Sequence, residues 1–245
     1  MKCPGQDSQY WKPGAIYEEK CPDCGNVIEF FKDDPYRKCS KCGKKIVNPR
    51  LDFGCAAYCP FAEQCLGTLP EEFLNQRADL LKDRVAVEMK RYFQPDFKRI
   101  GHATRVARHA EQIGKQEKGH LAVILMAAYL HDIGIKEAER KYNSSAARYQ
   151  ELEGPPIARA ILEKLGASAA IIDEVCDIVG HHHHPRPEET TNFKAVYDAD
   201  QIANLEALHE KKPVAAKTVE RLINNRLLTE AGKARARTVL SPPAA

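Results

Sequence analysis

Cysteine is confined almost entirely to one end of this 245-residue chain. Eight of its nine cysteines lie from Cys3 to Cys65, and the ninth is Cys176. In a reducing compartment, clustered cysteines are metal ligands more often than disulfides. The distribution therefore predicts a cysteine-rich metal-binding module over residues 1–68. A second domain is expected over residues 69–245, where helical periodicity takes over.

Two Cys-x-x-Cys-Gly motifs lie in this module, and fourteen residues separate Cys24 of the first from Cys39 of the second. Four thiolates at such spacing are typical of a closed, tetrahedral structural zinc site. The glycine after each motif permits a tight turn, and residues 26–38 between the motifs are expected to form a short hairpin. A module this small needs its metal to fold, because its hydrophobic core is thin. The predicted zinc ligands are Cys21, Cys24, Cys39 and Cys42.

Four further cysteines remain after that site is filled. Three of them lie in the segment CAAYCPFAEQC, whose spacing is less diagnostic than Cys-x-x-Cys. The leading interpretation is a four-iron iron–sulfur cluster. A second structural zinc site, or a disulfide or free thiols, are the open alternatives. The residues of this set are Cys3, Cys55, Cys59 and Cys65.

Charge and hydropathy exclude some classes of partner. The net charge of +3 is too small to demand a nucleic acid. Zinc ribbons can bind nucleic acid or protein. The basic residues around the second motif are more simply interpreted as a solvent-exposed surface, so no such partner is indicated. The longest apolar run, residues 121–130, is too short to span a bilayer. The beginning of the chain has no apolar signal segment, so a cytoplasmic protein with no membrane partner is expected.

The helical part contains a set of metal-ligand side chains. His131 and Asp132 end the apolar run LAVILMAAYL, with His102 upstream and Asp200 downstream. Two imidazoles and two carboxylates can hold one divalent cation, and this mixture suits Mn, Fe, Co, Ni or Zn better than Ca. Such an ion, with open coordination positions, can generate hydroxide and polarise a phosphoryl oxygen. The pattern predicts a divalent transition metal on these four residues.

Four motifs over residues 98–210 resemble those of one family. They are H-x-x-R-V-A from His102, H-D-I-G from His131, a histidine-rich turn from His181 to His184, and A-D-x-I from Ala199. Together they resemble the HD-domain superfamily of metal-dependent phosphohydrolases, in the subset that carries HDIG. The resemblance implies a mainly α protein: an all-α HD-domain helical bundle, here preceded by a small zinc-ribbon-like cysteine-rich module.

The same resemblance implies the metal ligands and a reaction class. The family's ligands correspond to His102, His131, Asp132 and Asp200 of this chain. Most members hydrolyse phosphate esters of nucleotides, so the expected substrate is a nucleotide or another small phosphomonoester. Relatives with two metals often carry a histidine at the position of Gln150, and its absence argues against a second metal held only by histidines.

Helical patterns frame these motifs. The polar residues 136–153 are expected to form a lid or entrance loop. The next helix is expected to begin at Gly154-Pro155-Pro156, because proline is tolerated in a first turn. The other expected helices span residues 71–93, 100–115, 120–130, 171–179 and 192–209, followed by two short ones after Pro213.

Catalytic roles follow from position and chemistry. Asp132 or a nearby carboxylate is expected to accept a proton from the attacking water. His181 and His182 are expected to donate to phosphate or protonate the leaving group, or to bind a second metal. His183 and His184 are expected to face solvent. Many relatives have a phosphate-contacting lysine just after HDIG; Lys136 lies one residue later, so the resemblance implies either that role or a surface lysine. Arg105 can reach a phosphate or pair with a carboxylate.

Two other classes of function compete with the hydrolase. Some relatives use two irons and oxygen to oxidise substrates, which requires a second metal set. Alternatively, the cysteine-rich module gates the enzyme as a redox-sensitive sensor or adaptor.

Overall fold

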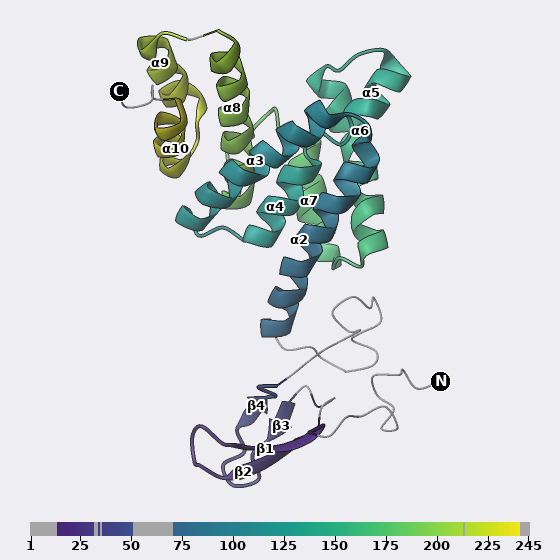
Figure 1. The fold of residues 1–245 in the computed structure, drawn as a ribbon, viewed down its shortest axis with the longest axis vertical. Helices are drawn as coiled ribbons and strands as arrows, with labels where there is room; N and C mark the ends of the chain where they lie inside the picture. Colours follow the sequence, from purple (N-terminus) through teal and green to yellow (C-terminus); the bar gives the residue numbers. More distant parts are fainter. Residues whose placement is uncertain (1–13, 32–33, 35, 51–70, 213, 241–245) are drawn as a thin grey trace. The chain divides into compact units, whose positions relative to one another are not determined.

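The computed structural model describes residues 14–31, 34, 36–50, 71–212 and 214–240, and the side chains of 71–79 are not described. The chain divides into two compact units, Met1–Leu80 and Leu81–Ala245. The boundary at 68/69 remains a prediction from the sequence. Small strands near one end are followed by helices, which confirms the mainly α class (Figure 1).

The first unit contains two separate antiparallel hairpins. β1 (Ile16–Lys20) pairs with β2 (Val27–Phe31), and β3 (Tyr36–Lys38) pairs with β4 (Lys45–Val47). The expectation of one hairpin between the cysteine motifs was wrong. Each Cys-x-x-Cys-Gly motif is instead the turn of its own hairpin, because a glycine with positive φ lets the chain reverse directly after the second cysteine. These are Gly25 at 69° and Gly43 at 75°.

The core of this unit is as small as expected. Phe30 is fully buried, and Ile28, Cys21 and Cys39 pack around it. The ring of Tyr17 stacks on Phe30 with 5.9 Å between centroids. Since so few apolar side chains are buried, cross-linking by the cysteine cluster must supply much of the stability.

The second unit is a helical bundle around one fully apolar helix. α4 (Leu121–Leu130) is hydrophobic on all sides, and it packs against α3 (Phe97–Gln116), α7 (Ala169–His181) and α8 (Thr191–Lys211). A helix that is apolar all round belongs in the centre of a domain. α2 (Glu71–Phe93) adds Val85, Met89 and Phe93 to this core. No helix among the described residues is long and apolar enough to cross a membrane.

The segment expected to be a lid is mostly helical. α5 (Ile135–Tyr142) and α6 (Ala147–Leu165) leave only a short connection between them. α6 begins well before its two prolines because its first half packs on α5. Glu153 accepts hydrogen bonds from Tyr142 Oη at 2.9 Å and Lys141 Nζ at 2.6 Å. These contacts stabilise the first turns of α6, which local sequence signals did not predict.

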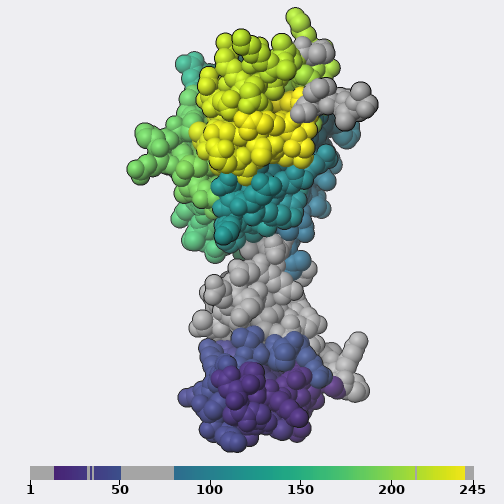
Figure 2. Space-filling view, turned by 90° about the vertical axis from the view of Figure 1, so that its left-hand side faces the viewer, coloured from purple at the N-terminus to yellow at the C-terminus, as the bar shows by residue number. Residues whose placement is uncertain are grey.

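Two further helices follow α8. They are α9 (Ala216–Arg226) and α10 (Glu230–Leu240). α10 packs against α8 and α9, and its surface adjoins that of α3 (Figures 1 and 2). Asp198 is fully buried on α8 and accepts from the backbone N–H groups of Leu228 and Thr229 at 2.7 and 2.8 Å. A carboxylate at the beginning of α10 satisfies N–H groups that have no partner within the helix.

Candidate functional site

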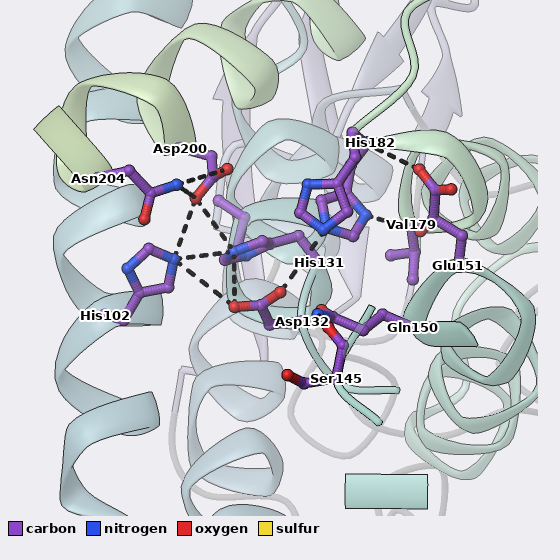
Figure 3. A network of polar contacts seen from close by, with 12 residues as sticks. His102, His131, Asp132, Ser145, Gln150, Glu151, Val179, His182, Asp200 and Asn204 are labelled. Atoms are coloured by element: carbon purple, nitrogen blue, oxygen red, sulfur yellow. Dashed lines mark hydrogen bonds and ion pairs between the residues drawn. The ribbon is translucent and has the colours of Figure 1, made fainter. Parts of the chain in front are cut away.

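Four side chains from separate elements converge at the centre of the helical unit (Figure 3). His102 comes from α3, His131 and Asp132 follow α4, and Asp200 comes from α8. His102 Nε2 lies 3.2 Å from His131 Nε2, 3.0 Å from Asp200 Oδ1 and 3.6 Å from Asp132 Oδ2. His131 Nε2 lies 3.4 Å from Asp132 Oδ2 and 3.6 Å from Asp200 Oδ1. The structure therefore brings together the four ligands that the sequence predicts.

These separations fit a single metal ion. With metal–ligand distances of about 2.1 Å, neighbouring ligand atoms lie about 3.0 Å apart at octahedral angles and about 3.4 Å apart at tetrahedral angles. The contacts of the two imidazoles with each other and with the two carboxylates run from 3.0 to 3.6 Å. Imidazole nitrogen and carboxylate oxygen together suit a divalent transition metal. The side chains are thus arranged as a cation site.

Hydrogen bonds outside the cluster orient two of these ligands. His131 is fully buried, and its Nδ1 lies 2.8 Å from the carbonyl oxygen of Ala128. Because a carbonyl only accepts, Nδ1 carries a proton, and Nε2 is the nitrogen that faces the cluster. Asn204 Nδ2 donates to both carboxylate oxygens of Asp200 at 3.0 Å. Asn204 was missed in the sequence, where only its position one turn after Asp200 offered a signal.

The ionisation of the side chains in the cluster also favours a bound cation. Burial lowers the pKa of His131, but Asp132 and Asp200 outweigh it and hold that pKa well above its usual value. Burial raises the pKa of Asp132, yet the imidazoles of His131 and His182 hold it well below its usual range. The carboxylates are therefore ionised, and a positive charge among them is stabilised.

The two carboxylate oxygens of Asp132 point toward different groups of side chains. Its Oδ2 belongs to the cluster, while its Oδ1 lies 3.7 Å from Nε2 of His182, which is 1% exposed. His131, Asp132 and His182 form a second group with ligand atoms within 4.8 Å of one another. His182 Nδ1 lies 2.9 Å from the carbonyl oxygen of Val179, so Nε2 presents a lone pair when the ring is neutral. The donor role that the sequence assigns to His182 stays a prediction.

Three buried polar atoms beside this group have no hydrogen-bond partner among the described residues. They are His182 Nε2, His183 Nε2 and Gln150 Oε1. The expectation that His183 faces solvent was wrong: its ring lies 3.9 Å from that of His182, and burial lowers its pKa to about 4. Unpaired buried polar atoms are rare in folded proteins and indicate a missing water, ion or ligand.

The outer part of the histidine turn is held by Glu151 of α6. Its Oε1 accepts from the backbone N–H of His183 at 3.0 Å, and its carboxylate pairs with Nδ1 of the exposed His184 at 2.8 Å. Glu151 therefore anchors the turn that supplies His182 and His183, and this contact leaves His184 outside the cluster.

Three predicted catalytic residues make their described contacts elsewhere. Arg105 pairs with Glu210 at 3.5 Å and Glu206 at 3.8 Å. Lys136 Nζ donates to the carbonyl oxygen of Tyr92 at 2.9 Å. His181 stacks on Phe193, and its Nε2 lies 2.9 Å from Glu189. These contacts give the three side chains structural roles, and their catalytic roles remain predictions without geometric support.

The cysteine cluster of the first unit fits a tetrahedral ion. Cys21 Sγ lies 3.6 Å from Cys42 Sγ, and Cys24 Sγ lies 3.6 Å from Cys39 Sγ. A zinc–sulfur distance of about 2.3 Å places sulfurs about 3.8 Å apart in a tetrahedron. Backbone N–H groups, first that of Cys42, lower the pKa of Cys39 to about 6. One thiol is thus readily ionised for binding a metal.

The second cysteine set lies outside the described residues. Cys3, Cys55, Cys59 and Cys65 therefore remain predicted ligands, and the choice between an iron–sulfur cluster, zinc and free or bridged thiols remains a prediction.

Comparison with known proteins assigns the helical segment. Residues 99–205 match the sequence model of the HD domain. The chain is similar to a predicted HD superfamily hydrolase from an uncultured Thermotogales bacterium, with 22% identity, TM-score 0.46, and coverage of 66% of this chain and 84% of that one. It is also similar to Bacillus subtilis YpgQ, with 18% identity, TM-score 0.47, and coverage of 66% and 89%. No curated protein matches the chain.

The family match and the site occupy the same segment, because His102, His131, Asp132 and Asp200 all lie within residues 99–205. The chain therefore contains an HD domain over residues 99–205.

Proposed function

We propose that this protein is a metal-dependent phosphohydrolase that acts on a nucleotide or another small phosphomonoester. The observation that carries the proposal is the convergence of four side chains inside the segment that matches the HD domain. The two imidazole nitrogens, of His102 and His131, lie 3.2 Å apart, and each lies 3.0–3.6 Å from an oxygen of Asp132 and an oxygen of Asp200. A divalent transition metal held there supplies Lewis acidity toward a phosphoryl oxygen and lowers the pKa of water.

The residues of this chain would share the remaining work. His102, His131, Asp132 and Asp200 hold the ion and so orient the phosphoryl group. In hydrolysis, the oxygen of water bonds to phosphorus, the bond from phosphorus to the ester oxygen breaks, and the ester oxygen leaves with a proton from solvent. The proton lost by water needs an acceptor near Asp132 Oδ1, the carboxylate oxygen that lies beside His182.

His182 is the better candidate for that proton acceptor. The sequence favoured Asp132, but the imidazoles around it hold its pKa well below the usual range after burial is offset, which makes it a weak base. His182 Nε2 lies 3.7 Å from Asp132 Oδ1, and Nδ1 faces the carbonyl oxygen of Val179, so Nε2 is the nitrogen of this ring that can exchange a proton beside Asp132. A neutral imidazole suits general-base catalysis near neutral pH.

The zinc ribbon serves a structural role in this proposal. Cys21, Cys24, Cys39 and Cys42 would hold one zinc ion that stabilises the two hairpins. Their sulfur separations of 3.6 Å and the thin core around Phe30 support this assignment.

A two-iron oxygenase is the second candidate. The unpaired acceptors His182 Nε2, His183 Nε2 and Gln150 Oε1 beside Asp132 favour it, because they could hold another cation. Gln150 replaces an imidazole with an uncharged amide oxygen, which is a poorer ligand for iron. This substitution favours the hydrolase.

Metal reconstitution separates the two candidates. The full chain is stripped with a chelator, reloaded with Mn, Fe, Co, Ni or Zn, and assayed on nitrophenyl phosphate and a panel of nucleotides. We expect phosphate release that needs no oxygen and saturates at one metal per helical unit. Activity that appears only with two irons and oxygen would replace the hydrolase with the oxygenase.

A further inference from the structure

We propose that Gln150 is a catalytic residue that holds the attacking water: its Oε1 accepts one O–H of that water beside Asp132. This inference rests on the proposed hydrolase function. It concerns a residue that sequence reasoning treated only as a missing histidine.

The amide of Gln150 is held in one orientation. Its Nε2 donates to the carbonyl oxygen of Ser145 at 2.6 Å, in the connection between α5 and α6. Exchanging the amide atoms would place two oxygens together, so the assignment is determined by this contact. The side chain is 7% exposed, and Oε1 is a buried acceptor without a hydrogen-bond partner in the described part of the chain. Such an atom indicates a ligand that donates to it.

A close backbone contact places Gln150 next to the metal cluster. A Cβ atom on Gly134 would lie 2.3 Å from the carbonyl oxygen of Gln150 and 2.5 Å from the nitrogen of Gly154. Gly134 comes two residues after Asp132. The absence of a side chain there lets α6 approach the turn that carries Asp132. Figure 3 shows Gln150 and His182 on the side of Asp132 opposite His102.

Two acceptor oxygens border this space. Asp132 Oδ1 is a carboxylate oxygen, and Gln150 Oε1 is an amide oxygen without a hydrogen-bond partner in the described part of the chain. A phosphate oxygen would be repelled there, so the substrate's phosphoryl group belongs on the other side of Asp132, at the metal. Water suits the space because it donates two hydrogen bonds and keeps its lone pairs free to attack phosphorus.

This geometry gives Gln150 and His182 complementary roles. Gln150 would accept one O–H and set the direction of the water's lone pairs. His182 or Asp132 would accept the other O–H, whose proton is transferred as the oxygen bonds to phosphorus. Because the amide is fixed by Ser145 before substrate binds, the water is oriented without further ordering of the side chain.

The test uses Gln150→Met, which keeps the length of the side chain but removes the acceptor, and Gln150→Glu, which restores acceptor oxygens. Gln112→Leu, at an exposed position on α3, is the control. We measure kcat, KM, metal content and circular dichroism of the full chain, and solve crystal structures of the wild type and Gln150→Met.

For Gln150→Met we expect kcat to fall by about 10²-fold, as for a misplaced reacting group, with KM and metal content unchanged. Gln150→Glu should recover at least part of that loss, and the control should match the wild type. The wild-type crystal should show water about 3 Å from Oε1, absent in Gln150→Met. These crystallographic results hold even if the wild type hydrolyses no phosphate ester, which would refute the function alone.

Three results would overturn the inference. The first is an unchanged kcat for Gln150→Met. The second is loss of one bound metal on that substitution, which would make Gln150 a metal ligand. The third is a wild-type crystal with a metal ion, or no water, against Oε1. If Gln150→Met fails to fold, Gln150→Glu and the wild-type crystal still decide the question.

Discussion

Asn204 clamps Asp200 from one helical turn away. Its Nδ2 lies 3.0 Å from both carboxylate oxygens, so the amide holds the carboxylate plane while Oδ1 faces His102. Partners of metal ligands typically contribute 10- to 100-fold to metal affinity. The contact therefore predicts that a residue with no direct place in the cluster controls its affinity.

Asn204→Leu should weaken metal binding by about 10- to 100-fold, because Asp200 loses its orientation. Competition with a chelator measures the dissociation constant, and circular dichroism checks the fold. Asn224→Leu is a matched control, since Asn224 makes the same i to i−4 contact with Glu220 at 3.2 Å on α9. Equal affinity in Asn204→Leu and the wild type would rule out the clamp.

Asp132→Ala should abolish phosphatase activity while the helical circular dichroism signal persists. The substitution removes one proposed metal ligand, Oδ2, together with Oδ1, the carboxylate oxygen that lies near His182. Asp173→Ala, which removes an exposed partner of Arg159, should leave the rate within about twofold, as surface contacts contribute little. Wild-type turnover by Asp132→Ala would refute the proposed site.

His182→Ala should lower kcat by about 10²-fold, the contribution of a positioned general base, and leave the metal content unchanged. The side chain borders Asp132 Oδ1 but the four ligands of the cluster remain. His184→Ala is the control, because His184 is exposed and pairs with Glu151. A fall from two metals to one in His182→Ala would instead support the two-metal candidate.

Cys24→Ser should remove one zinc per chain and destabilise the first unit alone. The cluster links both hairpins, and the core around Phe30 is too small to replace it. Elemental analysis and limited proteolysis measure the two effects. Cys176→Ser, within α7, should keep the zinc content of the wild type. Zinc retained in Cys24→Ser would contradict the four-cysteine site.

His109→Gln should flatten the loss of stability on acidification. Burial lowers the pKa of His109 from 6.5, although Glu206 partly opposes this. Just below pH 6.5 the unfolded chain therefore binds more protons than the folded one, so stability falls as pH falls. The substitution removes this contribution.

Urea unfolding at about pH 7.5 and 5.5 measures the effect. The wild type should lose more stability between the two values than His109→Gln. Equal losses, or a larger loss in the variant, would show that the burial of His109 does not control its ionisation.

Local signals were enough to predict which candidate ligand side chains come together and where most helices lie. The apolar run before His131 makes α4 a central helix, and the spacing of Cys21, Cys24, Cys39 and Cys42 brings four sulfurs together. These features depend on periodicity and short-range turns, which a linear sequence displays directly.

Long-range contacts explain two features that were predicted wrongly from the sequence: where α6 begins and where His183 lies. α6 begins seven residues before Gly154 because Glu153 binds side chains of α5, which outweighs the local signal of Pro155 and Pro156. His183 is drawn inward because Glu151, on another helix, holds the backbone of its turn. Neither partner is visible from the neighbouring residues in the chain.

The sequence by itself determined the chemistry of the site: which imidazoles, carboxylates and thiols are present, and that a helical core and small cysteine hairpins carry them. Only the tertiary structure decided how they are used. It placed Asp132 between the metal cluster and His182, and the close contact at Gly134 brought Gln150 near it. Packing also gave structural partners to three predicted catalytic residues, Arg105, Lys136 and His181. Side-chain direction depends on packing between distant segments, whereas ligand identity is written residue by residue.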